Sequence, residues 1–395
     1  MRQLPIPLAC CADRLLDRLA SATGSKAIAD LDGATLLGER AILGGMPIAG
    51  RISAGGGCRL YDAAGDTIAL NLARASDREL LPALFVTDEL NPHDDVGIAA
   101  RIADSDASAL LARGRSMGLA IAAEHETLPS GANPCIELGT GAPAITPRQR
   151  APRVVDLSAL WAGPLAAHLL WLAGADVVKV ESRRRPDAMR EGEKTFFALL
   201  NQGKKSVVLD FTDARERRAL LSIIGASDIV IEAARPRALA QLGIDGLHLV
   251  RTIPGLVWIT ITAHGAEGEA ANWVGFGDDC GVAGGLSAAL RAASGRTGFV
   301  GDAIADPLTG LWAALAAWKA WNAGRGGRFG LGMSHVVAHG LAEARESEPA
   351  GLQASLQAWS AAVGTSFPAV RRRPALALPS FGEHTNSYLA RARTC

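Results

Sequence analysis

One aspartate in the second half of this 395-residue chain has surroundings that suit a nucleophile. Asp306 lies in the segment 301–310, GDAIADPLTG, directly before a long apolar stretch that ends near Trp321. A proline at the next position favours the first turn of a helix, so we expect Asp306 at or near an N-cap. A helix N-terminus would keep the carboxylate ionised and could stabilise negative charge as an acyl intermediate forms. The same pattern suits a plain capping aspartate, and spacing alone does not choose between the two.

Motifs for other chemistries do not match. The turn after the strand near residue 155 reads WAGPLA from Trp161, which is not the GxGxxG of a dinucleotide site, and GxxxxGK[ST] does not occur. A GxSxG match at 114–118 lies at the end of a predicted helix, so it is not the strand-to-helix elbow of a hydrolase. His335 and His339 are four residues apart and would share one face of a helix. They lack a neighbouring glutamate and a third ligand, so helix packing is the better interpretation than a zinc site. The sequence therefore argues against a nicotinamide cofactor, P-loop chemistry and a bound metal.

The balanced charge of the chain creates no strong electrostatic field at its surface. Lys plus Arg and Asp plus Glu number 40 each, so nothing recruits nucleic acid or an anionic membrane, and an anionic ligand needs local cations. The longest apolar stretches, such as 310–321, are too short to span a bilayer, and the first eleven residues do not resemble a signal peptide. The six cysteines form no CxxC, which favours reduced thiols. We therefore expect a cytoplasmic protein without nucleic-acid or membrane partners.

The elements that must hold Asp306 are predicted from residue 153 onward. Helical stretches separate several short β-branched runs, and a long helix should follow Asp306. Such a pattern is typical of a mostly parallel sheet covered on both faces. The fold class is therefore α/β, with a large Rossmann-like domain. The predicted strands cover residues 154–157, 174–181, 206–211, 228–232 and 256–261.

The first third of the chain has a different pattern of predicted helices and strands. Helical patterns at 11–23 and 104–117 flank a β-like run at 58–72, which turns at Gly65. This predicts a smaller α+β domain. The run is preceded by three glycines that suit either an active-site loop or a turn into the strand. They are Gly55, Gly56 and Gly57.

Composition also divides the chain into regions. Residues 128–152 are rich in Pro, Gly and Thr and end in PRQRAP, which predicts a linker or boundary. We expect a small-domain-like region over 1–145 and a large domain over 150–345. A C-terminal tail, 346–395, should return to the large domain.

From Arg153 onward the sequence resembles the class III CoA-transferases, the CaiB/BaiF family. Several ordered motifs carry the resemblance, which makes it more specific than any one of them. It implies the Rossmann-like large domain and a smaller second domain. The motifs are WAGP at 161–164, GADVVKVE at 174–181, FALLNQGKKSVVLDF at 197–211, DIVIEAARPRALAQLG at 228–243 and FGEHT at 381–385.

The resemblance implies a mechanism. In the family, an aspartate before a Thr-Gly pair and a long helix attacks an acyl-CoA thioester. Asp306, followed by Thr309 and Gly310, matches that aspartate, and Asp302 is a rival in the same loop. A mixed anhydride and then an aspartyl-CoA thioester would carry CoA to an acceptor carboxylate. Acyl-CoA and a carboxylic acid would be the substrates, with no permanently bound cofactor.

The resemblance also implies CoA contacts. Arg183, Lys204 and Lys205 are chemically suited to CoA phosphates, although each alone could be solvated surface charge. The family's contacts carry over to Trp161, Ala162, Arg183 and Ala238.

The order of parts departs from the family. The segment 55–72 resembles the entry to the small domain, yet it precedes the large domain, which indicates a circular permutation or a fusion. Family members form interlocked dimers, so the resemblance implies a homodimer, possibly interlocked.

Two alternatives stay open, and the first is a CoA-ester isomerase of the same family, either a racemase or an intramolecular transferase. A racemase of the same family needs an acid and a base at the substrate α-carbon. The matching stretch, 275–285, lacks a histidine, and Asp278 and Asp279 within it have no assigned role. The racemase alternative would therefore need His264 or, less well, His335 near Asp306. A catalytically silent CoA-binding protein is the other alternative.

Overall fold

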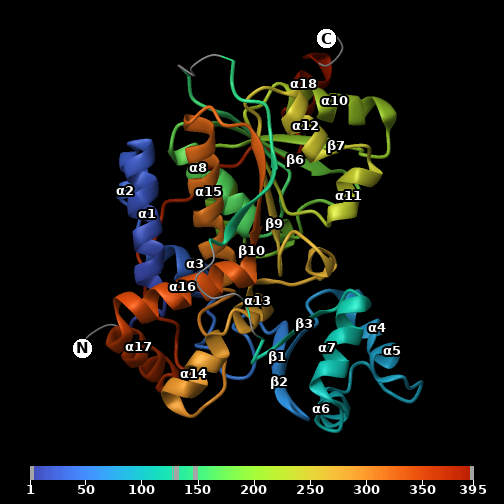
Figure 1. Ribbon diagram of the computed structural model, residues 1–395, viewed down its shortest axis with the longest axis vertical. Coiled ribbons are helices and arrows are strands. Elements are labelled where there is room, and N and C mark those ends of the chain that lie inside the picture. The colour runs from blue at the N-terminus through green and yellow to red at the C-terminus, as the bar shows by residue number, and fades with distance from the viewer. Residues whose placement is uncertain (1–3, 127, 129–132, 146–149, 392–395) are drawn as a thin grey trace.

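The computed structural model describes residues 4–126, 128, 133–145 and 150–391. Its larger part is built on a seven-stranded sheet in the order β4-β10-β9-β8-β5-β6-β7 (Figure 1). The edge strand β4 is antiparallel to β10, and the other neighbouring pairs are parallel. The strands are β4 (Cys135–Thr140), β5 (Arg153–Asp156), β6 (Asp176–Ser182), β7 (Lys205–Leu209), β8 (Ile229–Glu232), β9 (Val257–Thr262) and β10 (Gly327–Gly332).

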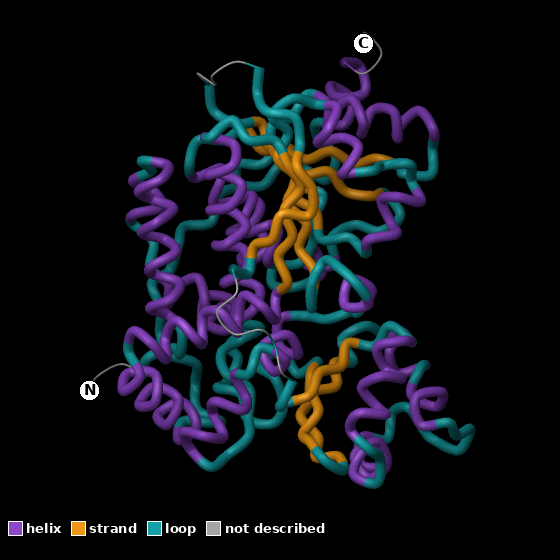
Figure 2. The backbone as a smooth tube through the Cα atoms, in the orientation of Figure 1, coloured by secondary structure: helices purple, strands orange, loops and turns teal. Residues whose placement is uncertain are grey.

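The predicted mostly parallel sheet is confirmed. Strands β5 to β9 are short runs rich in Val and Ile, and most of their side chains are buried on both faces. Such burial suits β-branched residues in a parallel sheet that helices cover on both sides. Figure 2 shows helices on either side of the strands.

The order of connections creates a crevice. From β5 the chain moves outward to β6 and β7, then returns to β8 on the other side of β5 and continues to β9 and β10. The loops that leave β5 and β8 therefore depart in opposite directions. Open α/β sheets bind ligands at such a point, outside the carboxyl ends of the strands.

Helix α15 is the longest helix and is buried on nearly all sides. Within the described residues, no helix is both long and apolar enough to cross a membrane. The helices outside the smaller unit of residues 58–123 are α1 (Ala9–Thr23), α2 (Lys26–Ala29), α3 (Gly33–Leu43), α8 (Ala162–Leu172), α9 (Lys194–Asn201), α10 (Ala214–Gly225), α11 (Pro236–Gln241), α12 (Gly246–Thr252), α13 (Gly277–Ala283), α14 (Leu286–Ser294), α15 (Ala305–Asn322), α16 (Met333–Ser347), α17 (Pro349–Ala361) and α18 (Thr385–Arg391), with 3-10 turns at Ala188–Glu191 and Glu269–Asn272.

A smaller unit, residues 58–123, contains a three-stranded antiparallel sheet and confirms the predicted α+β part. Gly65, with φ 91°, makes the predicted turn between its first two strands. One face of this sheet packs against the unit's own helices and the other face packs against α13. The elements are β1 (Cys58–Ala63), β2 (Asp66–Asn71), α4 (Ala75–Glu79), α5 (Leu81–Phe85), α6 (Asp95–Ala103), α7 (Ala107–Ser116) and β3 (Ala120–Ala123).

Two parts of the region 1–145 lie with the large sheet rather than with the smaller unit. Helix α1 runs beside α15 (Figure 1), where Trp318 Nε1 donates to the carbonyl of Ala22 over 2.9 Å. The apolar face of α1 explains this, because it joins the same core as α15 and α8. Strand β4, which falls within the expected linker 128–152, pairs with β10. Its half-exposed side chains suit an edge strand. Residues 129–132 and 146–149 of that expected linker lie outside the described residues.

The C-terminal tail lies against the large sheet. Along strand β7, the backbone N–H of His384 donates to the carbonyl of Ser206 over 2.9 Å, and Val208 N–H donates to Thr385 Oγ1 over 2.9 Å. Arg373 of the same tail forms a bidentate ion pair with the buried Glu39 of α3. The FGEHT motif thus lies along the outermost parallel strand.

Candidate active site

Asp306 is the second residue of α15 and lies in its first turn. The backbone N–H of Ala162, at the start of α8, donates to Asp306 Oδ1 over 3.3 Å. The two helices approach closely because Gly310 has no side chain: a Cβ there would lie 2.8 Å from the carbonyl oxygen of Ala162. Gly310 of the Thr-Gly motif therefore has a packing role that brings Asp306 to Ala162.

A cavity of about 320 Å³ opens in front of Asp306. It lies at the crevice where the strand order reverses, because the loops after β5 and β8 form one side of it. The other side is largely apolar. The lining includes Leu160, Ala162, Ala234 and Arg235 on the first side, and Ile261, Trp273, Val274, Phe276 and Met333 on the second.

The surroundings of Asp306 bring the pKa of its carboxyl group close to neutral pH. Burial raises the pKa of Asp306 to about 7, although the Arg40 guanidinium and the Ala162 N–H oppose the rise. The side chain is still partly exposed to the cavity. A partly desolvated carboxylate is a stronger nucleophile than one in water, and here it stays close to ionisation at pH 7.

Asp302, the rival aspartate, is held differently. Its side chain is fully buried, and Arg40 of α3 binds both of its oxygens, with 2.8 Å between Arg40 Nε and Oδ2. The Arg40 guanidinium also stacks over the Trp161 ring, 5.1 Å from its centroid. Asp302 is therefore a buried ion-pair partner, whereas Asp306 faces the cavity.

A glycine shapes the other side of Asp306. A Cβ at Gly277 would lie 2.1 Å from Asp306 Oδ2 and 2.5 Å from the carbonyl oxygen of Ala303. Helix α13 can therefore pass this close to the carboxylate only with a glycine at its first position.

The predicted CoA contacts other than the two lysines differ in their surroundings: one lines the cavity, one is buried and two are exposed. Ala162 lines the cavity, whereas the Trp161 ring is buried against Phe196, with 5.0 Å between ring centroids. Arg183 follows β6 at the same sheet edge and is exposed, with a 3.3 Å ion pair to Glu216. Ala238 is exposed in α11.

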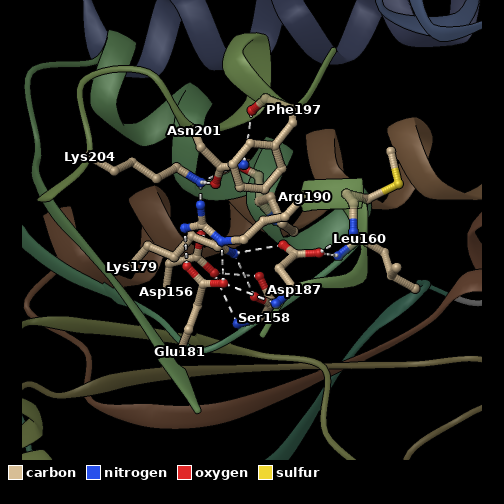
Figure 3. A network of polar contacts seen from close by, with 12 residues as sticks. Asp156, Ser158, Leu160, Lys179, Glu181, Asp187, Arg190, Phe197, Asn201 and Lys204 are labelled. Atoms are coloured by element: carbon tan, nitrogen blue, oxygen red, sulfur yellow. Dashed lines mark hydrogen bonds and ion pairs between the residues drawn. The ribbon is translucent and has the colours of Figure 1, made fainter. Parts of the chain in front are cut away.

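Lys204 and Lys205 do not reach the cavity. Lys204 is 3% exposed, and its Nζ lies 2.8 Å from Asp156 Oδ2 within a buried network (Figure 3). Lys205 begins β7 and pairs with Asp176 at the start of β6, with 2.7 Å between Nζ and the carboxylate. This is the amino edge of the sheet, opposite to the cavity. Contact between these two lysines and CoA phosphates therefore stays a prediction, which their ion pairs with Asp156 and Asp176 do not favour.

Of the three predicted loop glycines, Gly55 lies near Arg40. A Cβ at Gly55 would lie 3.4 Å from Arg40 Nη2, and Gly56 adopts a positive φ of 75°. Gly57 lies close to Ala73 and enters β1. This loop borders the Arg40–Asp302 pair, and none of its glycines lines the cavity as described.

The two aspartates of α13 accept backbone N–H groups. Asp278 accepts the Ala303 N–H over 3.0 Å, which fixes the turn before α15. Asp279 accepts the N–H of Phe276 and the side chain of Asn71, each over 3.0 Å. Burial raises the pKa of Asp278 to about 6 and that of Asp279 to about 7.

His264 lies behind the cavity wall. It is 3% exposed and contacts Trp273 edge-on at 5.9 Å, and one of its ring nitrogens lies within 4.8 Å of a carboxylate oxygen of Asp279 and of Cys280 Sγ. Burial lowers the pKa of His264 to about 3. The cavity lining contains no histidine among the described residues. His335 packs near Gly265, and His339 packs edge-on against Trp312 at 5.4 Å, so they face different neighbours.

Sequence reasoning missed three contributors to this site. Arg40 lies 262 positions from Asp302, and nothing in its local sequence indicates that pairing. Arg235 was quoted within a motif but not singled out, although it lines the cavity and is exposed. Gly277 was visible only as one glycine of a glycine-rich segment.

Part of the chain is similar to known proteins. Residues 152–346 match CoA-transferase family III. The chain is 31% identical over 172 residues to a succinyl-CoA–D-citramalate CoA-transferase of Chloroflexus aurantiacus, covering 42% of this chain and 43% of that protein. It is 35% identical over 124 residues to a probable fatty acyl-CoA transferase of Mycobacterium tuberculosis, covering 29% and 32%. The chain thus spans less than half the length of these curated relatives.

About half of the chain also aligns with solved structures. A hypothetical protein from Mycobacterium tuberculosis superposes with a TM-score of 0.45 and 28% identity, over 49% of this chain and 56% of that one. A CaiB/BaiF family protein from Brucella suis has a TM-score of 0.39 and 25% identity, over 47% and 53%. The segment that matches CoA-transferase family III, residues 152–346, carries Asp306 and strands β5 to β10 of the large sheet.

Proposed function

We propose that this protein transfers coenzyme A from an acyl-CoA to a carboxylic acid, with Asp306 as the nucleophile. The observation that carries the proposal is the position of Asp306. Its carboxylate faces a cavity of about 320 Å³ at the sheet's switch point and receives one N–H from Ala162. Relatives named as CoA-transferases support the same class of reaction.

The cavity supports a CoA-binding site at the carboxyl edge of the sheet. Arg235 lines it, and among the described residues no carboxylate pairs with this guanidinium. Arg183 lies at the same edge with only an exposed ion pair, which is worth little in water. Two arginines at this edge suit the phosphates of CoA, because guanidinium groups bind phosphate oxygens in pairs.

The reaction would proceed by exchange of acyl partners on Asp306. A carboxylate oxygen of Asp306 attacks the thioester carbonyl carbon, the C–S bond breaks, and CoA leaves as a thiolate. The thiolate attacks the aspartyl carbonyl of the resulting anhydride and releases the donor acid as a carboxylate. The acceptor carboxylate then displaces CoA from the aspartyl-CoA, and the thiolate attacks the acceptor's carbonyl carbon. Acceptor-CoA leaves and Asp306 is free again.

The surroundings of Asp306 suit these steps. The Ala162 N–H would stay on Oδ1 while Oδ2 attacks, and it would stabilise the charge on the tetrahedral centre of the aspartyl group. The apolar far wall, including Ile261 and Met333, would keep water from the anhydride. Asp302 is less suited, since both of its oxygens are bound to Arg40 in the interior.

An exchange assay tests the proposal. Wild-type protein, mixed with an acyl-CoA and an 18O-labelled carboxylic acid, should transfer CoA and leave 18O in the released donor acid. Asp306→Asn should abolish both events while binding CoA as before. A CoA-binding protein without catalysis would bind CoA in both forms and show no exchange in either. Asp302→Asn, if it folds, should retain exchange.

Two further parts of the proposal have their own support. The described cysteines Cys10, Cys11, Cys58, Cys135 and Cys280 are free thiols, which suits the reducing cytoplasm. A homodimer is supported by the family resemblance, and sedimentation of the purified chain would test it. The names of similar proteins include a probable fatty acyl-CoA transferase and a formyl-CoA:oxalate CoA-transferase. A panel of acyl-CoAs and carboxylic acids would therefore identify the donor and the acceptor.

A further inference from the structure

The loop between β5 and α8 presents the only N–H described on Asp306, that of Ala162. The loop covers residues 157–161 and contains no glycine. Leu160 nevertheless adopts φ 68°, the left-handed region that a leucine rarely occupies. A non-glycine residue holds such a conformation only when its surroundings impose it. Some contact must therefore fix Leu160, and Ala162 lies two residues further along.

Asp187 supplies that contact. Its Oδ1 accepts the backbone N–H of Leu160 over 3.0 Å (Figure 3). The other oxygen, Oδ2, lies 3.0 Å from the Nζ of Lys179 on β6. Asp187 is 3% exposed, and it reaches the loop from the segment after β6.

The rest of the loop is tied by the same network. Lys179 Nζ donates to the carbonyl of Ser158 over 2.9 Å, and Ser158 in turn donates to Asp156. Lys204 Nζ lies 2.8 Å from Asp156 Oδ2 and 2.9 Å from the carbonyl of Pro164 at the far end of the turn. The loop is thus held before and after Leu160 by two buried lysines.

The charges in this network balance. Burial alone would lower the pKa of Lys179, but Asp156 and Asp187 raise it above its ordinary value. Burial opposes ionisation of Asp156 as well, and Lys204 and Lys179 outweigh it, so the pKa of Asp156 is lowered. Two buried lysines face two buried aspartates, an arrangement stable only while each group keeps its partners. None of these four side chains lines the cavity.

We infer that Asp187 is a positioning residue for the proposed transfer reaction: with Lys179 it holds Leu160 in the left-handed conformation that directs the Ala162 N–H at Asp306. The inference rests on the proposed function of Asp306. It gives the buried network a role in catalysis through the loop, without contact to CoA or the acyl group. The network also explains why a lysine that looked suited to CoA phosphate is buried.

The loss of this positioning should appear in the pH profile. The groups that face Asp306 are Ala162 from α8, Arg40 from α3, Asp278 from α13 and Asp302 from the loop before α15. The Ala162 N–H and Arg40 favour the ionised form, and the two carboxylates oppose it. Without the N–H, the nucleophile should ionise at higher pH.

The test compares Asp187→Ala with Asp187→Asn. The readouts are the pH dependence of covalent adduct formation from acyl-CoA and the dissociation constant of CoA. Asp187→Ala should move the acid limb of the rate to higher pH and slow adduct formation by about tenfold or more, with CoA binding nearly unchanged. Asp187→Asn keeps an oxygen for Leu160 N–H and should recover most of the rate.

A matched control removes a buried carboxylate at the opposite edge of the sheet. Asp228 is 6% exposed and pairs with Arg150 over 2.6 Å, so Asp228→Asn should cost stability without moving the pH profile. If both Asp187 variants melt earlier but keep the wild-type pH profile and rate, the network is merely structural and the inference fails. If wild-type protein forms no adduct with any acyl-CoA, the proposed function fails and the inference with it. If Asp187→Ala does not fold, Lys179→Met takes its place in the comparison. A pH profile of Lys179→Met that is shifted to higher pH supports the inference. If the pH profiles of Lys179→Met and Asp187→Asn are both unshifted, the inference is overturned.

Discussion

Arg40 and Asp302 form a bidentate ion pair across 262 residues of sequence, with Asp302 fully buried and Asp306 only one helical turn away. The pair places a cation close enough to Asp306 to lower the pKa of that carboxyl group. The stack of Arg40 over Trp161 fixes the guanidinium from the other side. The charge of Arg40 therefore acts on two aspartates, and it binds only one of them.

Replacing Arg40 should affect both stability and ionisation. Arg40→Met leaves Asp302 buried without its partner, which should cost about 3 kcal/mol in the free energy of unfolding. It also removes a charge that lowers the pKa of Asp306, so the acid limb of the rate should move to higher pH. Denaturant unfolding and pH-rate profiles check the two effects. Adding Asp302→Asn to Arg40→Met should restore part of the stability. A double variant no more stable than Arg40→Met would contradict the ion-pair argument.

Gly277 should tolerate no side chain. Gly277→Ala places a methyl group 2.1 Å from Asp306 Oδ2, so the carboxylate must move. A displacement of about 1 Å should reduce kcat/KM on the order of a hundredfold. The matched control is Gly281→Ala in the same helix, where the nearest atom lies 3.7 Å from the new Cβ. Equal activity of the two variants would show that Asp306 does not need its present position.

Asp306 should lower the stability of the protein at alkaline pH. The pKa of Asp306 is raised to about 7 by burial, from 3.8, so between these pH values the folded state binds more protons than the unfolded state. Stability therefore falls as pH rises through this window. Asp306→Asn removes the effect and should stabilise the protein at pH 8 by ~1–3 kcal/mol, discounted for partial exposure. Near pH 4 the gain should vanish, and thermal unfolding at both pH values measures it. A gain of equal size at both pH values would contradict the raised pKa.

The cations around the sheet should differ in their effect on acyl-CoA binding. Arg235→Ala removes a guanidinium at the cavity and should raise KM for acyl-CoA about tenfold, the worth of one charge-assisted hydrogen bond. Arg183→Ala should act in the same direction. Lys205→Ala is the control, because Lys205 pairs with Asp176 at the opposite edge. A KM raised by Lys205→Ala alone would place CoA elsewhere.

Much of the fold could be predicted because its strands carry a strong local signal. The runs at β5 to β9 are short, apolar and β-branched, and each was expected within a few residues of its observed bounds. Strand β10 reads GRFGLG and has no such signal; it forms because β9 and β4 offer backbone partners on both sides. Strand β4 lies at the edge and is half-exposed, so its composition looked like a linker.

The site could be predicted only in part. Asp306 and Ala162 follow from ordered motifs, and the Thr-Gly pair indicates how closely their helices pack. Charge type alone misled at Lys204, because a sequence shows that a lysine is cationic but not that its ammonium group lies 2.8 Å from a buried aspartate. Arg40 was missed for a related reason: its partner is brought to it only by the packing of α3 against the large domain.

The most direct test is mass spectrometry of the intact protein mixed with a panel of acyl-CoAs and then treated with hydroxylamine. The account predicts a hydroxylamine-sensitive adduct on Asp306, seen after proteolysis as a hydroxamate at that position and absent from Asp306→Asn. An adduct on Asp302 instead, or steady exchange of CoA between acids with no adduct on Asp306, would contradict it.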